Sequence, residues 1–367
     1  MIDMCLVEQE TAINIYNSQK NDIDICKILD RKTHNNCIKE TIWNVETIIT
    51  NLEYSQFEEL VTFMESSDFL WSDVKLLKYI LFTLNDTIED NIVVLYRNKI
   101  IGCNLFITSI VSICGEIRKI RWSHSTYLLP EHRKYIGLQL FYEVNNLNDI
   151  WGFGLTSINR KLHKLNKTLF LTPSRAYVLN LDKYNNISQH DQNYYPPKFE
   201  VHNLSFEKCY SAKDHVMPNN GFWNKEIVDV DFIRDNEYMS RRFYNSPINY
   251  HIYKVSQKQE CDLLYFVVRI RVIKGIKYLF LVDYRFKVNT PLVFTYIIDA
   301  FEFLARNNGI SKGYIFTTLP ANIIEQDIRL ESYGTLSDII CNSEKVDSTF
   351  DLFVTPSDSD CDLIPIS

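Results

Sequence analysis

The stretch EIRKIRWSHSTYLLPEHRKYIGLQLFYEVNNL, residues 116–147, decides the fold. Its first part, through Leu129, contains β-branched and aromatic residues in the density that is typical of a strand. A charged loop follows, and apolar residues then recur at helical spacing, at Ile136, Leu140 and Val144. The stretch therefore predicts a strand that passes through a charged loop into a helix packed on a sheet.

The segments on either side extend this pattern into a mixed α/β unit. IWNVETIITN alternates like a strand, and SQFEELVTFMESS and WSDVKLLKYILFTL show the apolar periodicity of helices. Two β-branched runs separated by the polar residues 97–99 predict a hairpin. With a strand at 150–158, a short helix and a strand at 169–181, the predicted order is β, α, α, β, β, β, α, β, α, β.

The second half repeats this order without repeating the sequence. Turn-forming residues gather between 185 and 224, which is typical of a segment between domains. Beyond it we expect helices at 230–245 and 292–308. The strands expected there are 248–255, 261–273, 277–286, 313–319, 335–342 and 350–356.

The fold class predicted by these patterns is α/β with mixed sheets, in two domains. A length of 367 residues agrees with two domains. We expect an N-terminal extension at 1–40, a first domain at 41–185, a linker at 186–224 and a second domain at 225–367.

Composition and charge exclude several classes of protein. Apolar residues make up 46% and charged residues 23% of the chain, which is a globular balance. The net charge of -7 argues against a protein whose main partner is nucleic acid. No apolar run approaches the roughly 18 residues that span a bilayer, and the N-terminal MIDMCLVEQE is acidic, so we expect a cytoplasmic protein with no membrane insertion.

The cysteines predict neither disulfides nor a metal site. There are nine, without a CxxC pair, and this odd count fits reduced thiols. Cys26, His34 and Cys37 offer ligand atoms, but no second pair completes a tetrahedral set. We therefore expect no metal.

With this order of elements, the chain resembles a tandem GNAT-superfamily acyltransferase, and within it the bilobal sugar N-acyltransferases of surface-polysaccharide biosynthesis. The resemblance implies a loop of pattern (Gln/Arg)-x-x-Gly-x-(Gly/Ala) around the pyrophosphate of acyl-CoA, where backbone N–H groups at a helix N-terminus meet the anion. The match here runs from His132 to Gly137, with histidine at the first position and Tyr135 at the first glycine. A solvated basic turn that caps a helix is the alternative interpretation.

The resemblance implies a set of donor-binding residues on this stretch. The residues expected to contact acyl-CoA are Tyr127, Leu128, His132, Arg133, Lys134, Tyr135, Ile136, Gly137, Leu138 and Asn159. The corresponding loop of the second half, KVNTP, has no glycine. This implies one acyl-CoA site per chain, with the second domain serving as an acceptor-binding lobe.

His124 and Ser125 are the candidate catalytic residues. His124 lies on the strand beside the expected donor, and histidine titrates in the range that suits a general base. A structural histidine bonded to a backbone carbonyl is the alternative. The resemblance implies a tyrosine as general acid, but none occurs between Asn159 and Tyr177, so the general acid is unassigned.

The second half offers candidate acceptor-binding residues of the kind that contact nucleotide sugars. Arginines bind diphosphates with two donors, and tyrosines stack on bases or bond to sugar hydroxyls. The candidates are Arg241, Arg242, Tyr250, Tyr253, Asp283, Tyr284 and Arg285. The alternative is that the two arginines pair with nearby acidic residues. The tail with Asp358, Asp360 and Asp362 is interpreted as a polar tail.

We therefore predict an N-acyltransferase that uses acyl-CoA and a nucleotide-linked amino sugar, for O-antigen or capsule. Two alternatives stay open. The doubled fold is also that of aminoacyl-tRNA-dependent peptidoglycan transferases, although the acidic balance disfavours them. The irregular loop is also consistent with a non-catalytic GNAT-like binding protein.

Overall fold

The computed structural model describes most of the chain from Glu46 onward. The described residues are 46–66, 73–133, 135–153, 163, 168–181, 194–202, 204–215, 221–222, 228–256, 263–273, 275–287, 290–343 and 346–359. The expected N-terminal extension, and with it Cys26, His34 and Cys37, lies outside these residues, as do Lys134, Asn159, Asp360 and Asp362.

The first half has the predicted order of elements. They are β1 (Thr47–Asn51), α3 (Phe57–Ser66), α4 (Val74–Tyr79), β2 (Ile92–Tyr96), β3 (Lys99–Ile113), β4 (Glu116–Leu128), α5 (Tyr135–Asn145), β5 (Ile150–Phe153) and β6 (Leu169–Asn180). The hairpin turn between β2 and β3 is built by Arg97 and Asn98, both at positive φ. The short helix expected before β6 falls largely outside the described residues.

The second half contains most of the predicted elements, together with three strands and a short helix that were not predicted. Its elements are β7 (Lys198–Val201), β8 (Leu204–Cys209), β9 (Val230–Phe232), α7 (Asn236–Met239), β10 (His251–Ser256), β11 (Leu263–Ile273), β12 (Ile276–Phe286), α8 (Pro291–Asn307), β13 (Lys312–Thr317), α9 (Ala321–Ile324) and β14 (Leu330–Asn342). The helix predicted from residue 230 starts only at Asn236, because Val230–Phe232 pairs with β3. The prediction of a strand at 350–356 is wrong. The one β-bridge that this segment forms within the described residues is the isolated bridge between Leu352 and Val230.

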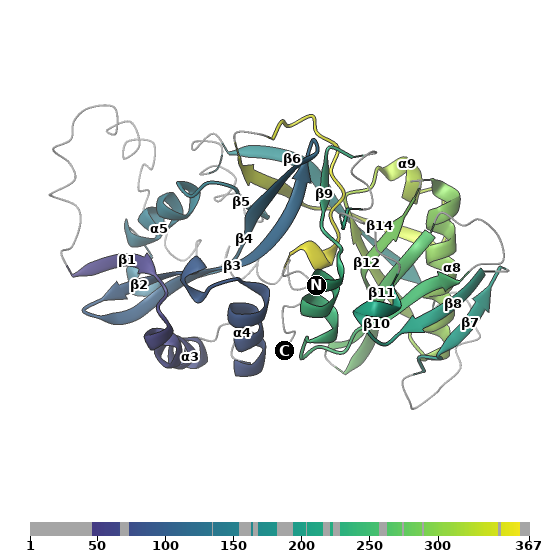
Figure 1. Ribbon diagram of the computed structural model, residues 1–367, viewed down its shortest axis with the longest axis horizontal. Helices are drawn as coiled ribbons and strands as arrows, with labels where there is room; N and C mark the ends of the chain where they lie inside the picture. The colour runs from purple at the N-terminus through teal and green to yellow at the C-terminus, as the bar shows by residue number, and fades with distance from the viewer. Residues whose placement is uncertain are drawn as a thin grey trace.

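The described strands form one continuous sheet through both halves. Its order is β1-β2-β3-β4-β5-β14-β6-β13-β12-β11-β10-β8-β7, and β9 pairs with β3. Although β14 belongs to the second half of the sequence, it lies between β5 and β6 of the first. Figure 1 shows the resulting two lobes, with α3, α4 and α5 around β1–β4 and with α8 beside β10–β12. The predicted domain limits stay a prediction, with β7 and β8 lying inside the expected linker.

Two parallel strand pairs occupy corresponding places in the lobes. β4 pairs with β5 and β12 with β13, and each connection passes through a helix, α5 or α8. A parallel pair needs such a crossover. Helix α8 begins at Pro291, and the hydroxyl of Thr290 accepts a hydrogen bond from the N–H of Val293 at 3.3 Å. Its buried face, from Val293 to Ala305, packs on the second lobe's core.

The lobes also contact each other through two π-helical turns at corresponding positions. η4 (Ile80–Leu84) follows α4, and η8 (Ser240–Tyr244) follows α7. The hydroxyl of Tyr79 donates to the carbonyls of Arg241 and Arg242, at 2.9 and 2.8 Å. Arg241 Nε donates to the carbonyl of Thr83 at 2.8 Å. Because π turns leave some helical carbonyls without their usual partners, these bonds fix the lobes to one another.

Gly313 tests the packing of α8 against β13. A Cβ at this position would lie 2.3 Å from Cε1 of Phe301, so Gly313→Ala forces the buried ring to move. We expect a loss of about 1 to 3 kcal/mol in the free energy of unfolding, measured by denaturant titration. The matched control is Gly152→Ala on β5, where the nearest atom to the new Cβ is 3.4 Å away. Equal losses at both glycines would contradict this account.

Candidate functional site

The first candidate site is the place where β4 separates from β5. Their parallel pairing is limited to Arg121 with Ile150 and Trp122 with Trp151, whereas β4 continues to Leu128. Along residues 123–128, no described strand pairs with this edge of β4. We call this place the first opening. Backbone N–H and C=O groups on such an edge need partners, and an extended ligand can supply them.

A bulge interrupts β4 within the first opening. Cys103 pairs with Tyr127 and Leu105 with His124, so Ser125 and Thr126 both lie opposite the single residue Asn104. Ser125 has a φ of 52°, which is the left-handed region that non-glycine residues rarely adopt. The bulge therefore turns the backbone at Ser125 away from the direction of a regular strand.

A polar cluster on the neighbouring strand supports this bulge. Asn104, 1% exposed, accepts hydrogen bonds through Oδ1 from the hydroxyls of Ser123 and Thr126. Asn104 and Thr126 were missed by the sequence analysis. Their signal is weak because an asparagine within an apolar strand becomes informative only once its cross-strand partners are known.

His124 and Ser125 lie together as predicted, but His124 is buried. Its side chain is 5% exposed, and Nδ1 lies 2.7 Å from Oγ of Ser125. Burial lowers the pKa of His124 to about 3. The imidazole is therefore neutral at physiological pH, whereas an efficient general base has a pKa near the working pH. In this geometry His124 orients the Ser125 hydroxyl, and its proposed role as base stays a prediction.

The charged loop after β4 forms a 3-10 turn, Pro130–His132, and leads into α5. Arg133 is held in place, because Nε donates to the carbonyl of Leu128 at 2.8 Å and the guanidinium lies over the ring of Tyr127 at 5.5 Å. No described residue hydrogen-bonds its two terminal nitrogens. The ring of His132 packs against Tyr96 at 5.1 Å. The loop thus presents an oriented guanidinium beside a helix N-terminus.

The start of α5 leaves space next to the backbone. A Cβ on Gly137 would meet only Cδ2 of Leu128, at 3.7 Å, so neither crowding nor φ requires a glycine there. Tyr135 is 54% exposed, while Ile136 packs on the core under α5 and Leu138 is half-buried. The described donor candidates follow one another from the end of β4 into the first turn of α5, and their role in donor binding stays a prediction.

The candidate acceptor residues on β12 are buried in a charge network. Asp283 accepts from Nε of Arg234 at 2.8 Å, from Nη1 of Arg285 at 2.8 Å and from the Tyr265 hydroxyl at 2.9 Å. Burial opposes ionisation of Asp283, but the two guanidinium groups outweigh it and lower its pKa to about 2. Arg234 was missed because a lone arginine beside apolar residues does not show in the sequence that it will be buried.

The other acceptor candidates differ in exposure. Arg242 is 2% exposed and donates through Nε and Nη2 to the carbonyls of Ser357 and Ser359. Tyr253 and Tyr284 have no exposed surface. Their hydroxyls bond to the Pro196 carbonyl and the Thr317 hydroxyl, respectively. Of the seven candidates, only Arg241 and Tyr250 retain substantial exposed surface, so the buried five must be uncovered before they contact a ligand directly.

Two further searches concern the described part of the chain alone. Within it, no three or more His, Cys, Asp and Glu side chains are grouped so as to hold a metal ion. No described helix is both long and apolar enough to cross a membrane.

No protein-family model matches the chain, and a search of curated proteins gives no match. Solved structures are similar, among them a GCN5-related N-acetyltransferase from Anabaena variabilis, with TM-score 0.51 and 11% identity over 80% of this chain and 72% of that one. Saccharomyces cerevisiae N-myristoyltransferase with bound myristoyl-CoA and inhibitors gives TM-score 0.52 and 10% identity over 82% of this chain and 80% of that one. These likenesses show the fold, and the predicted α/β architecture of two GNAT-like units is confirmed.

Burial of His124 predicts a pH-dependent stability. Its pKa of about 3 in the folded chain is below the value of about 6.5 in the unfolded chain, so its contribution is complete above pH 6.5 and is lost as pH falls toward 3. At pH 5 this amounts to about 2 kcal/mol relative to pH 7.5. We expect His124→Gln to flatten the stability profile by that amount in denaturant titrations. Parallel profiles for wild type and His124→Gln would contradict the burial.

Proposed function

We propose that this chain is an acyl-CoA-dependent N-acyltransferase whose donor binds in the first opening. One observation carries the proposal: a strand edge with no described strand beside it, a bulge and a cationic loop at a helix N-terminus follow one another along β4 and α5. This combination suits a long donor with an extended arm and an anionic end. The yeast structures of similar fold contain myristoyl-CoA, which supports a donor of this class.

In this proposal the pantetheine arm of the donor runs along the edge of β4 and pairs with backbone groups near Tyr127 and Leu128. The pyrophosphate lies at the start of α5, where helix N–H groups and the terminal nitrogens of Arg133 meet it. His132 and Lys134 belong to the same loop, and Asn159 is assigned to the donor site by resemblance alone. Gly137 provides the space for close approach.

The reaction then needs orientation more than strong acid–base groups. The acceptor amine attacks the thioester carbonyl carbon, the carbon–sulfur bond breaks, and a proton from the amine nitrogen passes to the departing thiolate. The re-aimed backbone at Ser125 is placed to polarise the carbonyl, and the neutral His124 keeps the Ser125 hydroxyl in position. An amino-sugar amine is less basic than lysine, so a larger fraction is already unprotonated. Orientation alone supplies much of such a rate.

We propose a nucleotide-linked amino sugar as the acceptor, for a surface polysaccharide such as O-antigen or capsule. Arg241 and Tyr250 retain exposed surface for a diphosphate and a ring. Arg242 supports Tyr250, since its Nη1 lies 3.3 Å from the Tyr250 hydroxyl. Asp283 and Arg285 are fully buried, and Tyr253 and Tyr284 belong to the second lobe's core, so these four residues do not contact the acceptor directly in this proposal. Because acyl-CoA and nucleotide sugars are both cytoplasmic substrates, we place the reaction in the cytoplasm.

The direct test combines an activity screen with calorimetry. We expect amide formation when acyl-CoA thioesters are screened against nucleotide-linked amino sugars, and one CoA bound per chain. Arg133→Ala should weaken CoA binding roughly tenfold or more, because a charge-assisted contact is worth about 1.5 to 3 kcal/mol. Arg118→Ala, at the far end of the same strand and paired with Glu116, is the control and should not change the affinity. Two CoA molecules per chain, or equal affinities for both variants, would refute the donor site.

Gly137→Ala separates a donor role for the glycine from a structural one. Alanine fits the helix, so we expect the free energy of unfolding to be unchanged or to rise by up to about 1 kcal/mol. If the pyrophosphate approaches the backbone here, the added methyl group should weaken CoA binding roughly tenfold, a loss of about 1.4 kcal/mol. Gln139→Ala on the same helix serves as the control for affinity. Unchanged CoA affinity in Gly137→Ala would place the pyrophosphate elsewhere.

A further inference from the structure

The second lobe contains an opening that corresponds to the first. β12 and β13 pair in parallel only through Leu279–Gly313, Phe280–Tyr314 and Leu281–Ile315, while β12 continues to Phe286. A bulge lies just past this pairing, because Val267 pairs with Asp283 and Val268 with Leu281, which leaves Val282 unopposed. We call this place the second opening. Its strand edge has the same need for backbone partners as the edge of β4.

The chain's own C-terminal strap, defined as Leu352–Ser359, lies in the second opening. All of its residues are buried. It bonds to both separated strands. Thr318, directly after β13, donates to the carbonyl of Leu352 and accepts from the N–H of Val354, each at 2.9 Å. On the other side, the Thr355 hydroxyl donates to Asp283 of β12 at 2.8 Å.

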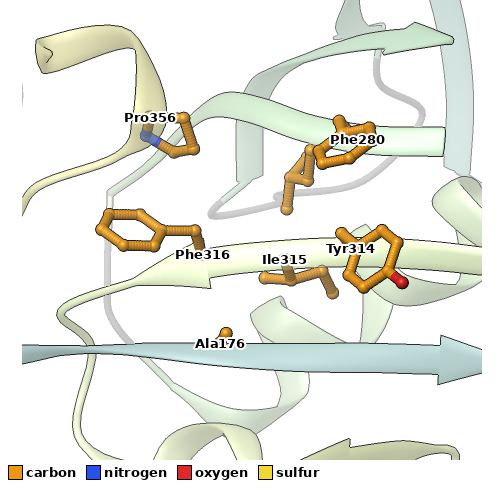
Figure 2. A pocket seen from close by; sticks show the side chains of 7 residues that line it. Ala176, Phe280, Tyr314, Ile315, Phe316 and Pro356 are labelled. Carbon is orange, nitrogen blue, oxygen red and sulfur yellow. The ribbon is translucent and has the colours of Figure 1, made fainter. Parts of the chain in front are cut away.

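A small apolar pocket remains beside the strap. It is lined by Phe280 and Leu281 of β12, by Tyr314, Ile315 and Phe316 of β13, by Ala176 of β6 and by Pro356. Figure 2 shows Pro356 and Phe316 at one end of this pocket and Phe280 and Tyr314 at the other. Pro356 therefore closes the space between the two strands at the point where their pairing ends.

Charged anchors hold the strap. Arg234 Nη2 contacts Asp358 Oδ1 at 2.5 Å and the hydroxyl of Ser357 at 3.0 Å, and both charged side chains are fully buried. Arg242 binds the carbonyls of Ser357 and Ser359, at 2.9 and 3.1 Å. The hydroxyl of Tyr238 donates to the Ser357 carbonyl at 3.0 Å. Buried guanidinium groups need such partners, so releasing the strap would leave them uncompensated.

We propose that the C-terminal strap permanently occupies the second opening, so that the second lobe cannot bind an acyl donor. An independent feature agrees: the N-terminus of α8, the counterpart of the anion site on α5, is capped by Thr290 of the chain itself. The conclusion that the second lobe cannot bind a donor rests on the proposed donor site of the first lobe. Whether the strap occupies the second opening is tested independently of that site. The strap thus fills the space between the two strands, and its Asp358 carboxylate is the anion that pairs with the buried Arg234.

Amide hydrogen exchange of the full chain, read by mass spectrometry with and without CoA, tests this proposal. The N–H groups of Val354, Thr355 and Asp358 are bonded to Thr318, Asp358 and Thr355, so peptides that cover the strap should exchange slowly. Saturating CoA should slow exchange in α5 and leave the strap unchanged. Fast exchange of the strap in the wild type, or faster exchange upon addition of CoA, would overturn the proposal.

Asp358→Asn is the variant that should release the strap. Loss of the charge-assisted bond to Arg234 should speed exchange of the strap roughly tenfold or more. The control is Asp347→Asn, the same change at an exposed turn where Asp347 binds Thr349. It should leave the exchange rate of the strap unchanged. Equal exchange of the strap in Asp358→Asn and in the wild type would refute Asp358 as its anchor. Should Asp358→Asn not fold, the wild-type measurements decide, together with Ser357→Ala, which removes a hydroxyl that accepts from Arg234 and should also speed exchange of the strap.

The same data separate this proposal from the proposed function. If CoA changes neither α5 nor the strap, and the strap exchanges slowly, the donor site fails while the occupied second opening stands. If CoA slows α5 and speeds the strap, the donor site stands and the closed second opening fails.

Discussion

The molecule depends on one constraint: strands that separate within a sheet expose backbone N–H and C=O groups that must find other partners. β4 separates from β5 after Trp122, and β12 from β13 after Leu281. Water or an extended ligand can satisfy the first edge. The second opening is filled from within the chain by the strap, which bonds to the side chains of Thr318 and Asp283. One architectural feature, used twice, thus has two different outcomes.

The charge network at the second opening opposes release of the strap. Asp283 alone receives bonds from Arg234, Arg285 and Tyr265, all without solvent contact. A buried ion pair adds little net stability when it forms, but the loss of one partner strands a charge and is strongly destabilising. The network therefore specifies where the strap lies more than it contributes to overall stability. Its position on β12 keeps the second lobe rigid.

Much of the fold could be predicted from the sequence because its long elements have strong periodicity. The strand, loop and helix at 116–147 and the apolar helix α8 are of this kind. The place of β14 between β5 and β6 could not, because strand order depends on contacts far apart in sequence. The tail was misjudged for the same reason: Thr355–Ser359 has the composition of an exposed polar turn, and only the buried Arg234 and Arg242 elsewhere make it part of the core.

The sequence predicted the main residues of the candidate site, but it did not predict the pKa of its histidine. Periodicity placed His124 and Ser125 on the strand beside a cationic loop, but the pKa of a histidine depends on burial that no local pattern encodes. The neutral imidazole at the bulge and the oriented Arg133 fit the proposed function, in which the site acts mainly by placing its reactants. Such a site requires rigid walls. Sharing one sheet with a lobe whose own opening is filled provides that rigidity, because the sheet that carries β4 and β5 continues through β14 and β6 into β12 and β13.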